Sequence, residues 1–248
     1  MNKLTFIKDL YLENKTSLLP SALWKVTKNI SNLRLERVKK PLSVRLLSNN
    51  QLFIFYDKSN SYQEYFVNNS DFFDLILLNQ KYYQEQLFKK DYTKYFKLAH
   101  NLKSIPNYTL DSNFEIRKAK ASQAKLISEF ISSCYPDLKP KPKTVINWSN
   151  HPTYDENLWI WIWDKSKDLP AALAISELDQ SIKEGALEWI QVHPNYQGYG
   201  LGKKLVYLTL DQLSISADFA TVGGKNPIAL KLYQSCGFTN KENFYVFH

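Results

Sequence analysis

A glycine-rich stretch between a predicted strand and a predicted helix is the part of the sequence best suited to chemistry. Its residues are Gln197, Gly198, Tyr199, Gly200, Leu201, Gly202 and Lys203. Three glycines within five residues leave backbone N–H groups uncovered at the positive end of the helix, an arrangement that binds phosphate or pyrophosphate. A Walker A loop would need Ser or Thr where Lys204 stands, and a dinucleotide loop would need glycine where Lys203 stands. The stretch therefore predicts a phosphate site of another kind.

Two patterns together resemble a known family. Gln197, Gly200 and Gly202 satisfy Gln/Arg-x-x-Gly-x-Gly/Ala, and the segment from Asn226 to Phe238 satisfies a second pattern, Asn…Ala…Leu-Tyr…Gly-Phe. In this order and at this distance they resemble the Gcn5-related N-acetyltransferase (GNAT) family over roughly residues 114–247. The resemblance implies acetyl-CoA as the cofactor, with the pyrophosphate of coenzyme A held by the glycine loop.

The resemblance also implies how the rest of acetyl-CoA is held. The pantetheine arm would pair with the exposed backbone of Ile190, Gln191 and Val192, and the amides near Ile190 would hydrogen-bond the developing oxyanion. Asn226 would hydrogen-bond the pantetheine or cap the helix that begins at Pro227. The implied cofactor-binding residues are Ile190, Gln191, Val192, Gln197, Gly198, Tyr199, Gly200, Leu201, Gly202, Lys203, Asn226 and Tyr233.

Two side chains are the predicted catalytic residues. Glu188 lies where many family members place the carboxylate that removes the amine proton, and alternation along a strand puts it on the face of Ile190 and Val192. Glu184 is the alternative base, because a bulge would shift the register. Tyr233 aligns with the tyrosine that protonates the departing thiolate, which its ordinary pKa near ~10 permits. Alternatively, Tyr233 is only an aromatic ring that packs on the cofactor without transferring a proton.

The acceptor is expected at the loop before the Trp-rich segment 158–163, where His151 and Asp155 are candidate substrate-binding residues. The tryptophans of that segment share one face and are interpreted as core. The predicted enzyme moves an acetyl group from acetyl-CoA to a primary amine by direct attack in a ternary complex. The alternative is a non-catalytic module that senses acyl-CoA while its basic N-terminal half binds RNA or an acidic partner.

Charge separates the chain into two parts. Residues 1–110 hold 17 Lys and Arg against 9 Asp and Glu, whereas residues 111–248 hold 15 of each, so the net charge of +8 lies in the first part. No five like charges are consecutive, and the basic excess is interpreted as a soluble face rather than a nucleic-acid site. Two cysteines far apart predict reduced thiols and no metal site.

The hydropathy of the sequence predicts the solubility and cellular location of the protein. The N-terminus has no signal-peptide core, and no stretch of about 18 apolar residues occurs. The sequence therefore predicts a soluble cytoplasmic protein, monomeric or homodimeric, without a membrane partner.

The expected fold class is α/β, an α+β mixed sheet of the GNAT type preceded by a small α+β domain. Turn-forming residues between 103 and 113 predict a linker, and hence domains at 1–105 and 111–248. In the first domain, periodicity predicts a helix at 6–14, strands at 33–38, 42–47 and 51–56, and one or two helices within 71–100.

The second domain alternates helical and extended segments, which is typical of a mixed sheet covered by helices. Its elements are expected at 114–118 (strand), 121–134 (helix), 158–163, 171–178 and 186–192 (strands), 201–213 (helix), 219–223 (strand), 227–236 (helix) and 244–247 (strand), with a Pro-rich break after 134.

Overall fold

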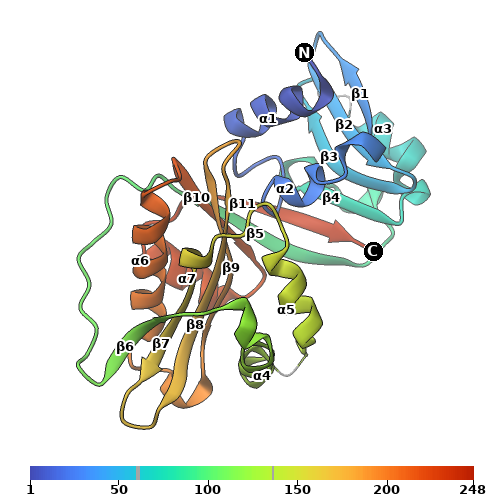
Figure 1. The fold of residues 1–248 in the computed structure, drawn as a ribbon. Helices are drawn as coiled ribbons and strands as arrows, with labels where there is room; N and C mark the ends of the chain where they lie inside the picture. The colour runs from blue at the N-terminus through green and yellow to red at the C-terminus, as the bar shows by residue number, and fades with distance from the viewer. Residues whose placement is uncertain (60–61, 136) are drawn as a thin grey trace. The chain divides into compact units, whose positions relative to one another are not determined.

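A computed structural model describes residues 1–59, 62–135 and 137–248. Its backbone forms two compact units (Figure 1). The first unit comprises residues 1–99, 221–230 and 239–248, and the second comprises residues 100–220 and 231–238. Two C-terminal stretches therefore belong to the first unit. The domains expected at 1–105 and 111–248 stay a prediction, and the pairing of residues 239–247 with residues 76–79 and 92–99 argues against independent folding of the second one.

The first unit contains a mixed sheet with the strand order β1-β2-β3-β4-β11-β5. Its strands are β1 (Arg34–Val38), β2 (Ser43–Ser48), β3 (Gln51–Asp57), β4 (Leu75–Asn79), β5 (Tyr92–His100) and β11 (Thr239–Phe247). The pair β3–β4 is parallel, whereas β11 is antiparallel to both of its neighbours. Tyr245 of β11 faces Leu78 of β4 on one side and Lys94 of β5 on the other.

The helices of the first unit are α1 (Lys3–Glu13), α2 (Trp24–Thr27) and α3 (Tyr62–Asn69). The first of them begins where a polar side chain caps it, because Asn2 accepts a hydrogen bond of 2.8 Å from the backbone N–H of Thr5. Its buried residues follow helical spacing and are Phe6, Ile7, Leu10 and Tyr11. The predicted helix at 6–14 is thus confirmed, with its start three residues earlier.

The helices predicted within residues 71–100 are wrong. This part of the chain forms β4, two short 3₁₀ turns at 80–82 and 85–87, and β5. A continuous apolar run such as 75–78 suits a buried strand as well as a buried helix. Ile76 and Leu78 are completely buried in a cluster that includes Phe247 of β11. The pairing with a distant strand, and not the local periodicity, decides the structure here.

The second unit contains an antiparallel sheet with the strand order β9-β8-β7-β6. Its strands are β6 (Phe114–Lys118), β7 (Trp159–Asp164), β8 (Leu169–Asp179) and β9 (Glu184–Val192), and β10 (Phe219–Gly224) crosses the boundary between the units. Its helices are α4 (Ala124–Cys134), α5 (Pro142–Ser149), α6 (Leu201–Ser214) and the end of α7 (Pro227–Ser235). The helix α5 occupies the segment predicted as a Pro-rich break, since a proline at the first helical position is compatible with a helix.

Helices cover both faces of this sheet (Figure 1). On one face the tryptophans of β7 pack against α4, in a cluster that contains Trp159, Trp161, Trp163, Leu173, Ile175, Ile127, Phe130 and Ile131. On the other face Ile160, Ile162, Ala172 and Ala174 pack against Leu201, Leu205 and Leu208 of α6. The interpretation of the three tryptophans as core residues is confirmed.

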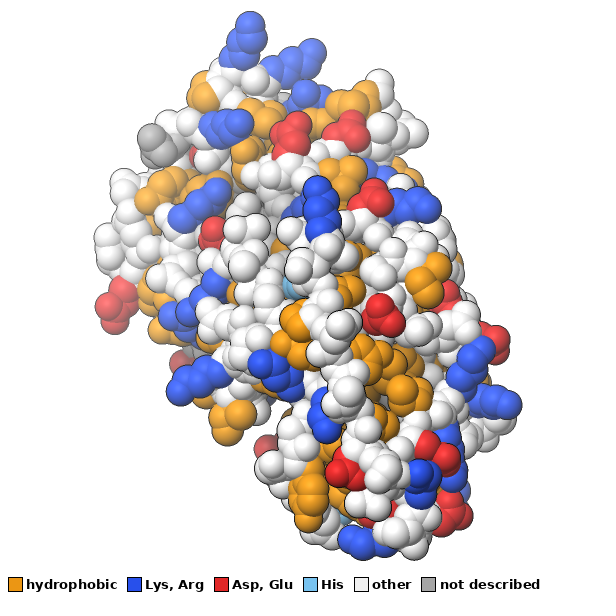
Figure 2. Space-filling view, turned by 90° about the vertical axis from the view of Figure 1, so that its left-hand side faces the viewer, with side chains coloured by type: hydrophobic (Ala, Val, Ile, Leu, Met, Phe, Trp, Pro, Cys, Tyr) orange, Lys and Arg blue, Asp and Glu red, His pale blue; other side chains and the backbone are white. Residues whose placement is uncertain are grey.

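The surface gives two further observations. Within the described residues, no helix combines the length and the apolar character that crossing a membrane requires. On the face drawn in Figure 2, Lys and Arg side chains stand in several separate places among neutral and acidic ones.

Candidate active site

The glycine loop presents its backbone to open space. The N-cap of α6 is Gly200, which has φ 71° and ψ 6°, and Gly198 has φ 87°. Both values lie in the left-handed region that glycine tolerates best. A Cβ atom added at either glycine would meet no atom of the described residues within 4 Å. The open side of the loop is therefore wide enough for a ligand to approach the backbone.

The first turn of α6 is uncapped. In the part of the chain that the structure describes, no side chain caps this turn, and its first backbone bond joins the N–H of Lys204 to the carbonyl of Gly200 at 3.3 Å. The N–H groups of Leu201, Gly202 and Lys203 consequently have no acceptor within the helix. These donors, together with the helix dipole, form a site that suits an anion.

A buried hydrogen bond anchors the turn that leads into this loop. The Tyr196 hydroxyl donates to Asp164 Oδ2 at 2.9 Å, and the Ser166 hydroxyl donates to Asp164 Oδ1 at 2.7 Å. The bond from Ser166, supported by the bond from Tyr196 and opposed by burial, lowers the pKa of Asp164 to about 2. Burial, followed by the bond to Asp164, raises the pKa of Tyr196 to about 12. At neutral pH the pair is a phenol bonded to a carboxylate, which ties the loop to the end of β7.

Glu188 lies at a β-bulge in β9. Ser176 of β8 faces Leu187 and Ile175 faces Trp189, so Glu188 between them has no residue opposite. Side-chain alternation is interrupted at such a bulge. Regular alternation therefore does not connect Glu188 to Ile190, and the expected shared face of these two residues stays a prediction. The Glu188 side chain is half-buried.

Tyr233 of α7 is a buried phenol in electrostatic contact with Glu188. Its side chain is 7% exposed, and its ring meets the Phe238 ring edge to face at 5.6 Å. Burial raises the pKa of Tyr233 far above its ordinary value, and Tyr135, Cys236 and Glu188 each raise it further. The ordinary pKa near 10 expected from the sequence is therefore wrong. The phenol keeps its proton at neutral and moderately alkaline pH.

The alternative base occupies a different environment. Glu184 opens β9, opposite Asp179, and its side chain is 1% exposed. An amine from solvent reaches the half-buried Glu188 more readily than this buried carboxylate.

Three further predicted site residues make local contacts. Asn226 caps α7, because its Oδ1 accepts from the backbone N–H of Ile228 at 2.8 Å. Asp155 Oδ1 accepts from the backbone N–H of Asn157 at 2.8 Å and so starts a short 3₁₀ turn. His151 is half-buried in the turn after α5. Their predicted roles toward cofactor and acceptor stay predictions.

The remaining predicted cofactor-binding residues differ in the face of the sheet on which they lie and in the exposure of their side chains. Ile190 and Val192 are half-buried on the α6 side, whereas Gln191 is buried on the opposite side. In the loop, Tyr199 is 63% exposed, and Lys203 is exposed with its ammonium group 5.7 Å from the Tyr207 ring.

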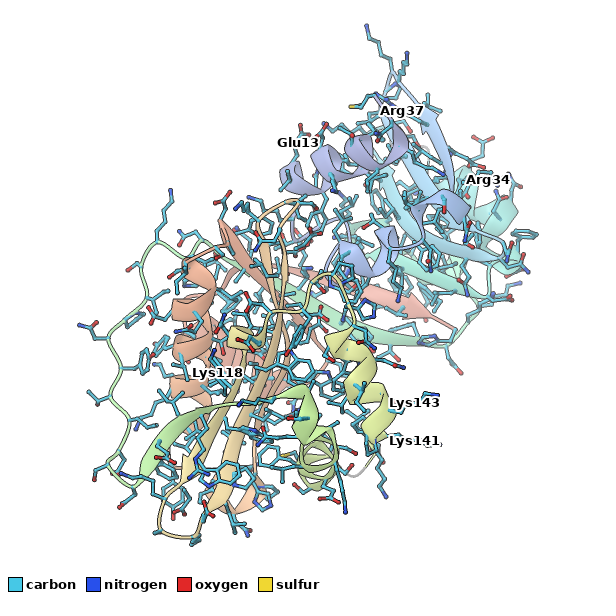
Figure 3. All side chains as sticks on the ribbon, viewed as in Figure 1. Glu13, Arg34, Arg37, Lys118, Lys141 and Lys143 are labelled. Carbon is cyan, nitrogen blue, oxygen red and sulfur yellow. The ribbon has the colours of Figure 1, made fainter. Side chains whose placement is uncertain are left out.

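Sequence reasoning missed an aromatic pair beside Glu188. Trp148 of α5 stacks on Trp189 of β9 with ring centroids 5.4 Å apart and 27° between the planes. Trp189 directly follows Glu188, so the pair lies next to the candidate base. The sequence offered one signal for this pair, namely Trp189 next to Glu188 in the same predicted strand. The charged Lys141 and Lys143 at the start of the same helix extend outward (Figure 3).

Metal ligands do not cluster in the part of the chain that the structure describes. Within residues 1–59, 62–135 and 137–248, no three His, Cys, Asp or Glu side chains lie together in a way that could hold a metal ion.

Comparison with known proteins finds a family model that matches part of the chain, and solved structures of similar fold. Residues 124–238 match the sequence model of the Acetyltransferase (GNAT) family. The structure resembles a GCN5-related N-acetyltransferase from Sphaerobacter thermophilus, which is 10% identical, with a TM-score of 0.64 over 91% of this chain and 84% of that chain. It also resembles a GNAT-family acetyltransferase from Colwellia psychrerythraea, which is 17% identical, with a TM-score of 0.63 over 99% of this chain and 96% of that chain. No curated protein matches the chain in sequence. The family resemblance and the mixed α/β fold class are confirmed.

Proposed function

We propose that this protein transfers the acetyl group of acetyl-CoA to a primary amine. The proposal starts from the match of residues 124–238 to the GNAT acetyltransferase family. One observation carries the proposal: the uncapped start of α6, with open space beside Gly198 and Gly200, follows the strand that bears Glu188 after one short 3₁₀ turn at Pro194–Tyr196. A candidate anion site and a candidate base thus lie close together in the sequence, on either side of this turn.

The residues around the loop fit coenzyme A. The N–H groups at the start of α6 would bind the pyrophosphate, and the bond between Tyr196 and Asp164 keeps the preceding turn in place. The backbone of Ile190, Gln191 and Val192 would hold the pantetheine arm. Bound acetyl-CoA supplies an activated acyl group as its thioester.

Two side chains divide the proton transfers. Glu188 accepts the proton of the acceptor amine, since its side chain is half-buried rather than enclosed and an amine can reach it. Tyr233 keeps its proton because burial raises its pKa, so it is available as the donor to the departing thiolate. The electrostatic influence of Glu188 on Tyr233 supports their action in one site.

The cysteines favour direct attack by the amine over an acetyl-cysteine. Burial raises the pKa of Cys134 to about 11, and burial also raises the pKa of Cys236. The thiolate is the reactive form of cysteine, and both groups are thiols at neutral pH. The amine would therefore attack in a ternary complex, with His151 and Asp155 as candidate contacts to the acceptor.

Calorimetry and a thiol assay test the proposed function. Acetyl-CoA should bind with the same affinity in the presence of a metal chelator, because backbone N–H groups and not a metal hold the phosphates. Coenzyme A release should then depend on the amine in a panel of alkylamines, polyamines, amino acids and peptides. Binding without release for any amine would favour a sensing module, and absence of binding would refute both.

A further inference from the structure

Gln191 carries a buried amide that the proposed chemistry does not use. Its side chain is 3% exposed, and neither Oε1 nor Nε2 has a hydrogen-bond partner in the described part of the protein. Buried side-chain amides are bonded in most folded proteins, because the lost hydration is otherwise not replaced. An amide kept in this state lowers the stability of the free protein and calls for a partner that arrives later.

The strand register places Gln191 on the α4 side of the sheet. It faces Leu173, which belongs to the core cluster under α4, and its neighbour on the same face is Trp189. Beyond the end of β9, His193 continues this direction, with its ring 6.0 Å from the Phe130 ring of α4. Gln191 thus lies between the aromatic pair beside Glu188 and the residues around His193.

A cleft of about 270 Å³ opens beyond the end of β9, and the nearest residue to Gln191 in sequence that lines it is His193. Its wall includes Phe130 and Ser133 of α4 together with His193. The volume suits a small chemical group rather than a large ligand. Gln191 does not line this cleft itself, so a ligand there would meet its amide only after a change of the Gln191 side-chain rotamer.

We propose that Gln191 is a specificity-determining residue that binds a carboxamide group of a ligand. The glutamine amide offers one acceptor oxygen and an N–H donor, and a second amide offers the complementary pair. Two ligands of the proposed function, on which this inference rests, contain such a group: the pantetheine arm of acetyl-CoA, or an acceptor amine that carries an amide. A strand advances about 3.3 Å per residue, so three residues separate Glu188 from Gln191 by about 10 Å, which two or three peptide units span.

The test replaces the amide by an apolar side chain of similar length, Gln191→Met, with Leu173→Met as the matched control from the facing position. Three quantities are measured for each protein: the melting temperature without ligand, the Kd of acetyl-CoA, and kcat/KM for leucinamide and for isoamylamine. The two amines differ by a carboxamide group only. The melting temperature of Gln191→Met should equal or exceed that of the wild type, because an unpartnered polar group is removed.

The ligand measurements distinguish the two sources of the amide. If the pantetheine arm is bound, Gln191→Met weakens acetyl-CoA about tenfold or more, and both amines are affected alike. If the acceptor is bound, the Kd of acetyl-CoA is unchanged and kcat/KM for leucinamide falls about tenfold while that for isoamylamine stays constant. The control variant should show neither pattern.

Two results would overturn the inference. A lower melting temperature of Gln191→Met with unchanged kinetics would mean that the amide has a structural partner in the free protein. The second result is a Gln191→Met protein with an unchanged Kd for acetyl-CoA and the wild-type ratio of kcat/KM for the two amines, or an unchanged Kd with no acetylation of either amine. It would mean that Gln191 recognises no carboxamide. Binding of acetyl-CoA to the wild type shows separately whether the proposed function stands.

Discussion

Gly200 and Gly202 form a matched pair for testing the anion site, because alanine at each position meets a different environment. Gly200 has φ 71°, and its missing Cβ would point into open space. Gly202 lies inside α6 without a positive φ, and a Cβ there would lie 3.4 Å from Leu232 Cδ2. Gly200→Ala therefore strains the backbone on the open side of the loop, whereas Gly202→Ala leaves the helical backbone conformation at position 202 unchanged.

The expected magnitudes follow from these environments. An alanine in the left-handed region costs roughly 1–2 kcal/mol, which lowers the melting temperature of a chain of this size by about 2–8 °C. Loss of one hydrogen bond from an N–H group to a phosphate costs about 1.5–3 kcal/mol, or about 10- to 100-fold in affinity for acetyl-CoA. At Gly202, a gain in helix propensity of about 0.8–1.0 kcal/mol offsets the close contact with Leu232. Gly202→Ala should retain wild-type stability and affinity.

Calorimetry with acetyl-CoA and thermal unfolding of the two alanine variants test this reasoning directly. Equal affinity of Gly200→Ala and the wild type would show that the loop does not bind the phosphates. An equally large loss in Gly202→Ala would show that the effect comes from disturbed packing of α6 and not from the open side of the loop.

Three other predictions concern the mechanism, the anchoring carboxylate and the C-terminal strand. Glu188→Gln and Tyr233→Phe should each lower kcat at least about 100-fold with little change in acetyl-CoA affinity. The Glu188 variant should lose less activity at high pH than at neutral pH. Unchanged kcat values and pH profiles would remove both residues from the mechanism. Because the pKa of Asp164 is lowered to about 2, its stabilising effect should be complete above the unfolded pKa near ~3.9 and be lost as the pH falls through about 2. Unfolding measured from pH 5 to pH 2 should show a weaker acid dependence for Asp164→Asn than for the wild type, and parallel curves would contradict this. A fragment of residues 111–248 should be poorly soluble, because β11 would lack both β4 and β5; a soluble, cooperatively folded fragment would refute the prediction.

Local chemistry made the glycine loop and the start of α6 predictable from the sequence. The glycines around residue 200 require an unusual backbone, and the apolar residues that follow repeat with helical spacing, so the start of α6 was predicted at the correct residue. The tryptophans of β7 were interpretable for a similar reason, since alternate residues of a strand share a face.

The remaining features depend on distant parts of the chain. The apolar residues of β4 became a strand because β11 pairs with them, and nothing near residue 75 indicates that partner. The bulge at Glu188 depends on how β8 and β9 align, and a difference of one residue changes which face a side chain occupies. The raised pKa of Tyr233 comes from burial by surrounding elements, which a motif cannot indicate.

The place of β11 also bears on how quickly the protein folds. Asn79 and Glu242, which hydrogen-bond across β4 and β11, are 163 positions apart in the sequence. Contacts over such separations form slowly, because a long loop must close before they stabilise anything. During synthesis β4 and β5 are complete long before their shared neighbour exists, and their unpaired edges are then open to association with other chains. Substitutions in β11 should therefore change the yield of folded protein through refolding rate and aggregation, even where the proposed catalytic residues are unchanged.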